Sequence, residues 1–181
     1  MIIIVTGLPR SGTSLMMQLL EKCNIPIYAD FQREKDINNP EGYYELEAVK
    51  GIVKNNAFLK EGEGKALKVV APLPMFLDKS LKYKVIFMRR DMEEILRSQE
   101  KMLEKDQSAE RQKFATIYEG HLAKTYAFLN GNSIPFIDVQ HRDLIQNPEI
   151  EIQKLIDFLE VDKSVEDLIS VVKPDLYRNR N

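Results

Sequence analysis

The chain has 181 residues, 44% hydrophobic and 30% charged, and this length and composition are those of one folded domain, residues 1–181, with a substantial core. A formal net charge of −2 excludes the global basic field that attracts nucleic acid or an anionic membrane surface. Cys23 is the single cysteine, which excludes an intrachain disulfide. The sequence shows neither the pattern of a signal peptide nor a run of ~20 apolar residues. We therefore expect a cytoplasmic protein without a membrane span.

The first predicted element is a short apolar strand, Ile2–Thr6, which leads into a glycine-rich loop and then a helix. Gly7 and Gly12 have the spacing of a P-loop, G-x-x-x-x-G-K-[ST], but Thr13 stands where that motif has lysine. Glycines let the backbone turn with its N–H groups pointing inward, and the helix N-terminus adds partial positive charge. Arg10 supplies a charged fork that suits phosphate or sulfate. The segment therefore predicts an anion-binding loop.

Short apolar runs then alternate with segments whose apolar residues recur at helical intervals. Further strands are predicted at Leu67–Ala71, Val85–Met88 and Pro135–Val139, with a weak one at Pro26–Tyr28. Helices are predicted at Ser14–Lys22, Leu46–Phe58, Met92–Lys105 and Ala109–Leu129, from Pro148 onward, and over Ser164–Val172. Strands separated by helices indicate an α/β fold: a three-layer α/β/α domain with a central parallel sheet, like that of P-loop NTPases. Ligands of such sheets bind at the carboxyl ends of the strands, where the glycine-rich loop lies.

A second anion site is predicted where the strand before Arg89 ends. Arg90 stands at the carboxyl end of that strand, and Asp91 is a candidate N-cap for the following helix. Ser98 lies about 10 Å along the helix, so Arg90 and Ser98 together suit a second phosphate. The alternative is that the two arginines are surface cations paired with neighbouring carboxylates, an arrangement that contributes little to stability. The carboxylates in question are Asp91, Glu93 and Glu94.

These motifs resemble those of a known family. The loop Gly7–Leu15 resembles the 5′-phosphosulfate loop of sulfotransferases, P-[KR]-S-G-T-[TS]-x-[LW], and Arg90–Ser98 is similar to the family's 3′-phosphate motif. Phe136–Leu159 is similar to the ending Y-E-D-L…P…L-x-F-L, and Asn39–Glu45 to the element N-P-x-G-[YF]-[WYF]-E. The four segments are in the family's order and span nearly the whole chain.

The resemblance implies a sulfotransferase that uses 3′-phosphoadenosine-5′-phosphosulfate (PAPS) and needs no metal. Its sulfuryl group would move to a hydroxyl or amine of a small-molecule or glycan acceptor, with neither the acceptor nor the oligomeric state readable from the sequence. The resemblance assigns the 5′-phosphosulfate to Pro9, Arg10, Ser11, Gly12, Thr13 and Ser14, and the 3′-phosphate to Arg90 and Ser98.

In-line transfer requires stabilisation of the leaving oxygen, which Arg10 can supply, and a base for the acceptor's proton. Many family members carry a histidine in a K-x-H element, but Lys68-Val69-Val70 stands here, so only the lysine, Lys68, is matched. We expect Glu45, after two tyrosines, to be the base. The alternatives are that Glu45 is only a first-turn helix residue favoured by the helix dipole, or that His141 is the base.

Two other functions compete with sulfuryl transfer. A P-loop nucleotide or nucleoside kinase using Mg-ATP would require a lysine after Gly12 and a metal-binding acid at a strand end. The lysine is absent, and Asp138 is the candidate for the acid. The second competitor is a nucleotide-binding module without catalysis, which the short chain and the absent histidine leave open.

Overall fold

A four-stranded parallel sheet forms the centre of the structure, a computed structural model that describes residues 1–30 and 42–172. The strands are β1 (Ile2–Gly7), β2 (Ala66–Lys68), β3 (Tyr83–Arg89) and β4 (Phe136–Gln140), in the spatial order β2-β1-β3-β4. β1 lies in the interior, where Ile4 pairs with Leu67 of β2 and Val85 of β3. Because all four strands run in one direction, their carboxyl ends meet at one edge of the sheet.

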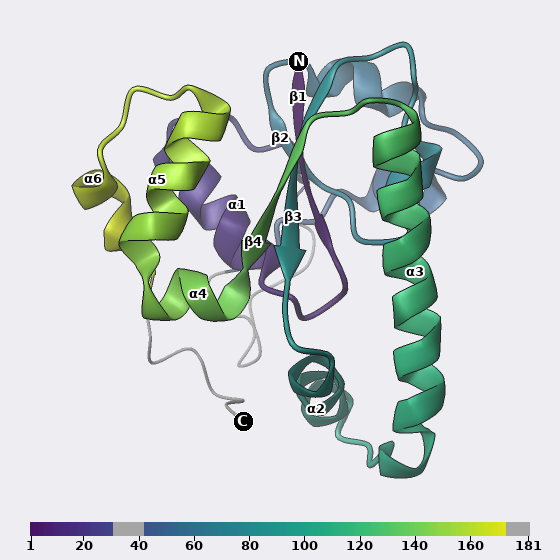
Figure 1. Ribbon diagram of the computed structural model, residues 1–181. Coiled ribbons are helices and arrows are strands. Elements are labelled where there is room, and N and C mark those ends of the chain that lie inside the picture. Colours follow the sequence, from purple (N-terminus) through teal and green to yellow (C-terminus); the bar gives the residue numbers. More distant parts are fainter. Residues whose placement is uncertain (31–41, 173–181) are drawn as a thin grey trace.

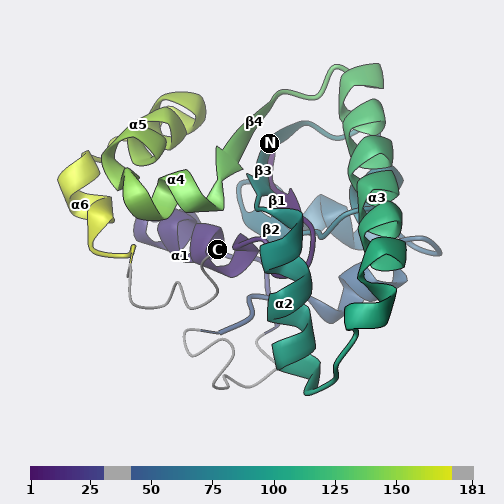
Figure 2. The same cartoon turned by 60° about the horizontal axis from the view of Figure 1, so that its bottom comes forward.

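Helices cover both faces of this sheet, which confirms the predicted three-layer architecture (Figure 1). One face carries α1 (Thr13–Lys22), α4 (His141–Gln146), α5 (Pro148–Leu159) and α6 (Val165–Ile169). The other carries α3 (Arg111–Gly131), preceded by η4 (Ser108–Glu110), and the short 3₁₀ helices η1 (Glu47–Gly51), η2 (Ala57–Gly62) and η3 (Leu73–Phe76). α2 (Met92–Leu103) lies beyond the carboxyl end of β3, and it comes to the front when the molecule is turned (Figure 2). No helix within the described residues is long and apolar enough to cross a membrane.

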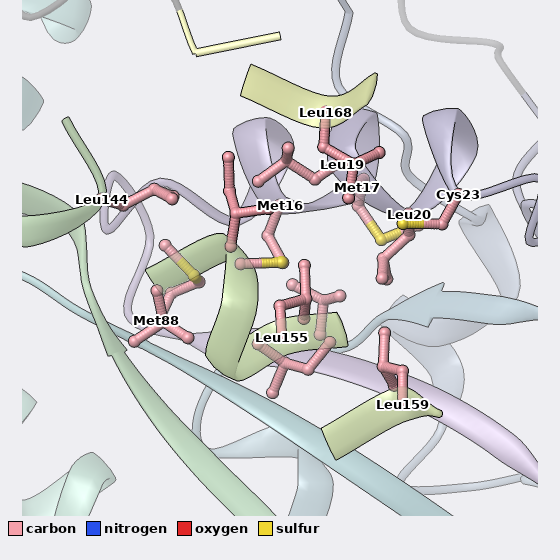
Figure 3. Close-up of a cluster of buried hydrophobic side chains, with 14 of the residues drawn as sticks. Met16, Met17, Leu19, Leu20, Cys23, Met88, Leu144, Leu155, Leu159 and Leu168 are labelled. Carbon is pink, nitrogen blue, oxygen red and sulfur yellow. The ribbon is translucent and has the colours of Figure 1, made fainter. Parts of the chain in front are cut away.

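The face under α1 is closed by a methionine- and leucine-rich cluster (Figure 3). Met16 and Leu20 of α1 and Leu155 of α5 have no exposed surface, and Met88 of β3 packs among them. Burying one such side chain stabilises the fold by about 1.5–3 kcal/mol. This packing fixes α1, and with it the loop that precedes α1, against the sheet.

The opposite face is joined to α3 through Tyr126. The Tyr126 ring stacks on Phe87 of β3 with centroids 4.3 Å apart, and its hydroxyl accepts a hydrogen bond of 2.9 Å from Arg89 Nη1. The same hydroxyl donates to Asp138 of β4. Burial, followed by the hydrogen bond to Asp138, raises the pKa of Tyr126 to about 12. Arg89 and Asp138 are therefore held on the α3 side of the sheet, away from α1.

The structure corrects three predictions of local structure. The helix predicted over Leu46–Phe58 is wrong, because the segment forms the separate 3₁₀ helices η1 and η2. Gly51 is a poor helix former, and Asn55 accepts a hydrogen bond from the Ala57 N–H, which competes with a continuous helix. β2 is also shorter than predicted and ends at Lys68, although the chain continues to hydrogen-bond to β1 for three more residues. At Pro26–Tyr28 the pairing is limited to a single bridge.

Candidate active site

The loop between β1 and α1 forms the first half of the site. Gly7, Arg10 and Gly12 have φ angles of 144°, 70° and 98°, in the region that glycine adopts most readily. At Gly12 the packing excludes a side chain as well, since a Cβ would lie 2.5 Å from Cδ2 of His141. The turn brings the N-terminus of α1 to the carboxyl end of β1, where N–H groups and the helix dipole favour an anion.

The polar side chains of the loop differ in exposure. Ser11 and Thr13 are buried, Ser14 is half-buried and Pro9 is exposed. Ser11 Oγ has no hydrogen-bond partner within residues 1–30 and 42–172. A buried hydroxyl normally has one, so this donor beside the helix N-terminus is suited to an anionic ligand.

The second predicted anion motif meets the loop directly. Arg10 Nε donates a hydrogen bond of 3.1 Å to Ser98 Oγ on α2, and Arg90 Nη1 donates one of 3.0 Å to the Arg10 carbonyl. The register of the sheet explains the meeting, because Gly7 at the end of β1 lies opposite Met88 near the end of β3. The two predicted anion motifs therefore form one composite site at the carboxyl edge of the sheet.

Arg90 is held in this site by an acidic neighbour. Its Nε donates a hydrogen bond of 2.8 Å to Glu94 Oε2, and the two side chains are only 9% and 6% exposed. Arg90 is thus paired with one of the three carboxylates of the alternative, Glu94, but the pair is buried and not a solvated surface pair. Arg89, the preceding residue, is bound instead to Tyr126 on the α3 side.

His141, the first residue of α4, packs against the loop at Gly12 and is 8% exposed. Burial, and then the charge of Arg90, lowers the pKa of His141 to about 3. An imidazole with this pKa is neutral at physiological pH and is a very weak base. The geometry therefore disfavours His141 as the base and makes it a packing partner of the loop.

Glu45 and Lys68 lie together at the end of β2. Lys68 Nζ is 3.7 Å from Glu45 Oε1 and also donates a hydrogen bond to the Tyr43 carbonyl. The Lys68 side chain is 6% exposed and that of Glu45 34%. Glu45 precedes η1 rather than lying in its first turn, so the helix dipole does not account for it. The structure therefore brings two of the predicted catalytic residues, Glu45 and Lys68, together at the end of β2.

Asp138, the candidate metal-binding acid, accepts a hydrogen bond from Tyr126 on the α3 face of the sheet. The glycine-rich loop leads into α1 on the opposite face, so the Asp138 side chain is turned away from the loop. Within the described ranges, no group of three or more His, Cys, Asp and Glu side chains is placed to hold a metal ion. The first residues of the Asn39–Glu45 element lie outside the described residues.

Comparison with known proteins identifies the family to which the chain belongs. Residues 2–177 match the family model of the sulfotransferase domain. The structure is similar to the sulfotransferase domain of the olefin synthase from Synechococcus PCC 7002, with a TM-score of 0.52 and 15% identity over 97% of this chain and 78% of that one. It is also similar to the sulfotransferase domain of the curacin biosynthetic pathway, with a TM-score of 0.57 and the same identity and coverage. No curated protein matches the chain significantly.

Because the family model covers almost the whole chain, the chain belongs to the sulfotransferase family, whose members are transferase enzymes. The two structural likenesses establish the fold, an α/β fold of the P-loop type around a parallel sheet.

Two residues of the site, Met102 and Glu94, were missed from the sequence as functional candidates, and His141 was considered only as a base. Met102 places its Sδ 3.7 Å from Arg10 Nη1, and His141 packs on Gly12. Glu94 was considered only as a surface partner, although its spacing of four residues from Arg90 is the spacing at which helical side chains meet. The sequence carried that signal for Glu94, whereas the contacts of Met102 and His141 depend on the tertiary fold.

Proposed function

We propose that the chain transfers the sulfuryl group of PAPS to a hydroxyl or amine of a small-molecule or glycan acceptor, as one domain over residues 1–181. The observation that carries this proposal is the junction of Arg10, Ser98 and Arg90, which joins two anion motifs into one site. A nucleotide with phosphate groups at both its 5′ and 3′ positions matches such a site. The single cysteine supports a reducing, cytoplasmic setting.

The two ends of the donor would bind different elements. The backbone N–H groups of the loop, the N-terminus of α1 and the hydroxyls of Ser11, Thr13 and Ser14 suit the 5′-phosphosulfate. Arg90 directly follows the end of β3, and Ser98 lies on α2. Both side chains suit the 3′-phosphate. Arg10 would lie between the two anions, because its side chain already reaches Ser98 from the loop.

The transfer follows from this placement. The acceptor oxygen or nitrogen forms a bond to sulfur as the bond from sulfur to the bridging phosphate oxygen breaks, so negative charge develops on the leaving phosphate. Arg10 and the loop N–H groups stabilise that charge. Glu45 takes the acceptor's proton, and Lys68, 3.7 Å away, orients the carboxylate. The moving group carries less negative charge than a phosphoryl group, so the proposal includes no metal.

A ligand comparison tests this function against its two competitors. Isothermal titration with 3′-phosphoadenosine 5′-phosphate, the desulfonated product, is expected to give tight binding that does not depend on magnesium. Tight, magnesium-dependent binding of ATP would favour a kinase. Donor labelled with ³⁵S is expected to pass its sulfate to some acceptor, and R10A is expected to lower this transfer by about 10³-fold. Binding of the donor without transfer to any member of a broad acceptor panel would favour a non-catalytic module.

A further inference from the structure

Glu94 is one of the most deeply buried charged side chains at the carboxyl edge of the sheet. Its carboxylate is 6% exposed and contacts the Arg90 guanidinium, itself 9% exposed, at 2.8 Å. Burying a carboxylate is unfavourable unless a cation and hydrogen bonds compensate for the lost water. The proposed mechanism uses Arg90 but gives its buried partner Glu94 no part.

The backbone under Glu94 is fixed at the start of α2. Its N–H donates a hydrogen bond of 3.0 Å to the Asp91 side chain, which caps the helix. Ile95 and Leu96, the next two residues, are 1% and 4% exposed. The carboxylate therefore projects from a capped and buried helical turn, and its position does not depend on a mobile loop.

The Arg90 guanidinium is held by acceptors at two of its nitrogens. Glu94 accepts from Nε at 2.8 Å, and the Arg10 carbonyl accepts from Nη1 at 3.0 Å. Because the guanidinium is planar, acceptors at two nitrogens fix the direction in which its fork points. A long side chain that is ordered before its ligand arrives loses less conformational entropy on binding.

We propose that Glu94 is a positioning residue that holds Arg90 in the orientation in which it binds the 3′-phosphate of the nucleotide. Glu94 sets the affinity for donor and product without touching either, and this inference rests on the proposed function. Its negative charge acts in two opposing ways, because it attracts Arg90 and repels a bound phosphate. The orienting hydrogen bond is therefore the main contribution, and a glutamine retains an acceptor for it.

Glu93, the preceding residue of α2, provides a matched control. It is 37% exposed and pairs with Arg97 at 3.0 Å and with Arg111 at 2.8 Å. Replacing Glu93 therefore removes one carboxylate from the same turn of the same helix without changing a direct contact of Arg90.

The test is isothermal titration of 3′-phosphoadenosine 5′-phosphate into the full chain and its variants, at a temperature where circular dichroism shows each to be folded. We expect E94A to bind at least about tenfold more weakly than the wild type, E94Q within about threefold of it and E93A within about twofold. If Glu94 serves stability alone, E94A lowers the melting temperature and binds as the wild type does, which overturns the inference. E94Q as weak as E94A would contradict an orienting hydrogen bond.

Two other outcomes, an E94A variant that does not fold and a wild type that does not bind, can be told apart from failure of the inference. If E94A does not fold, E94D carries the test, because it keeps the charge but withdraws the carboxylate from Arg90 by one methylene. About fivefold weaker binding by E94D is expected, and wild-type affinity would overturn the inference. If the wild type itself binds no bisphosphate, the proposed function fails, and the inference fails with it. Failure of the inference alone requires a wild type that binds and an E94A variant that binds equally well.

Discussion

The two halves of the site differ in how firmly the fold holds them. On the proposed donor side, Arg10, Arg90 and Ser98 come from the ends of β1 and β3 and from α2, and hydrogen bonds of 3.0–3.1 Å interlock them. On the proposed acceptor side, Glu45 and Lys68 approach only to 3.7 Å, and Glu45 is one-third exposed. Glu45 also stands in a connecting segment, ahead of the short helix η1, rather than on a strand or α-helix.

The difference in rigidity matches two different kinds of recognition, that of the donor and that of the acceptor. Recognition of a donor needs a fixed geometry, which parallel strands and their following helices supply. Recognition of an acceptor varies with the connections between elements, which change most readily without disturbing the core. Substitutions on the donor side should therefore affect nucleotide binding, and substitutions on the acceptor side should affect turnover alone.

The largest expected effect is that of Arg10, which belongs to the proposed donor side and is proposed to act on the leaving group. R10A should lower turnover by about 10³-fold, because a charge that develops on the leaving phosphate would lose its main cationic partner. The measurement is ³⁵S transfer from labelled donor, with R97A, a substitution at an exposed arginine of α2, as the control. An R10A variant that retains a tenth of wild-type turnover would remove Arg10 from the chemistry.

Glu45 tests the acceptor side. E45Q should lower turnover by about 10²-fold or more, since the amide cannot take the acceptor's proton. The affinity for 3′-phosphoadenosine 5′-phosphate should stay within about twofold of the wild type, because Glu45 has no proposed contact with the nucleotide. A parallel loss of binding and turnover would place Glu45 on the donor side and contradict the division.

Ser98 tests the donor side with a smaller change. S98A removes the hydroxyl that accepts from Arg10 and is proposed to contact the 3′-phosphate. Nucleotide binding should weaken by about tenfold, the effect of losing a hydrogen bond to a charged group. The turnover number at saturating donor should fall less than the affinity does, and steady-state kinetics over a range of donor concentrations separates the two.

The last expected effect is on stability and not on binding or turnover, and it arises from His141. Its pKa is lowered to about 3 in the folded chain, below its ordinary value of about 6.5, so the unfolded chain binds an extra proton between these values. Stability should therefore fall as the pH drops below about 6.5, by up to about 1.4 kcal/mol per pH unit from this group. H141Q should lose less stability than the wild type between pH 7 and pH 5 in urea unfolding, and equal losses would show that another group is responsible.

The local structure around Arg10, Arg90 and Ser98 could largely be predicted from the sequence, because its signals are local. The order of strand, glycines, arginine and helix specified the loop, and the spacing of Arg90 and Ser98 specified the second motif. The acceptor side was less accessible, since Glu45 and Lys68 are 23 positions apart and the predicted helix between them is not formed. The burial of Arg90 with Glu94 also depends on packing, which the i,i+4 spacing alone does not distinguish from a surface pair.

In the proposed complex, Arg10 and Arg90 bind opposite ends of one nucleotide. The most direct test compares 3′-phosphoadenosine 5′-phosphate with adenosine 5′-phosphate, which lacks the 3′ group, in titrations of the wild type and R90A. The wild type should prefer the bisphosphate by about 100-fold, and R90A should lose most of that preference while binding adenosine 5′-phosphate almost unchanged. Equal binding of the two ligands by the wild type, or an R90A variant that keeps the preference, would contradict the account.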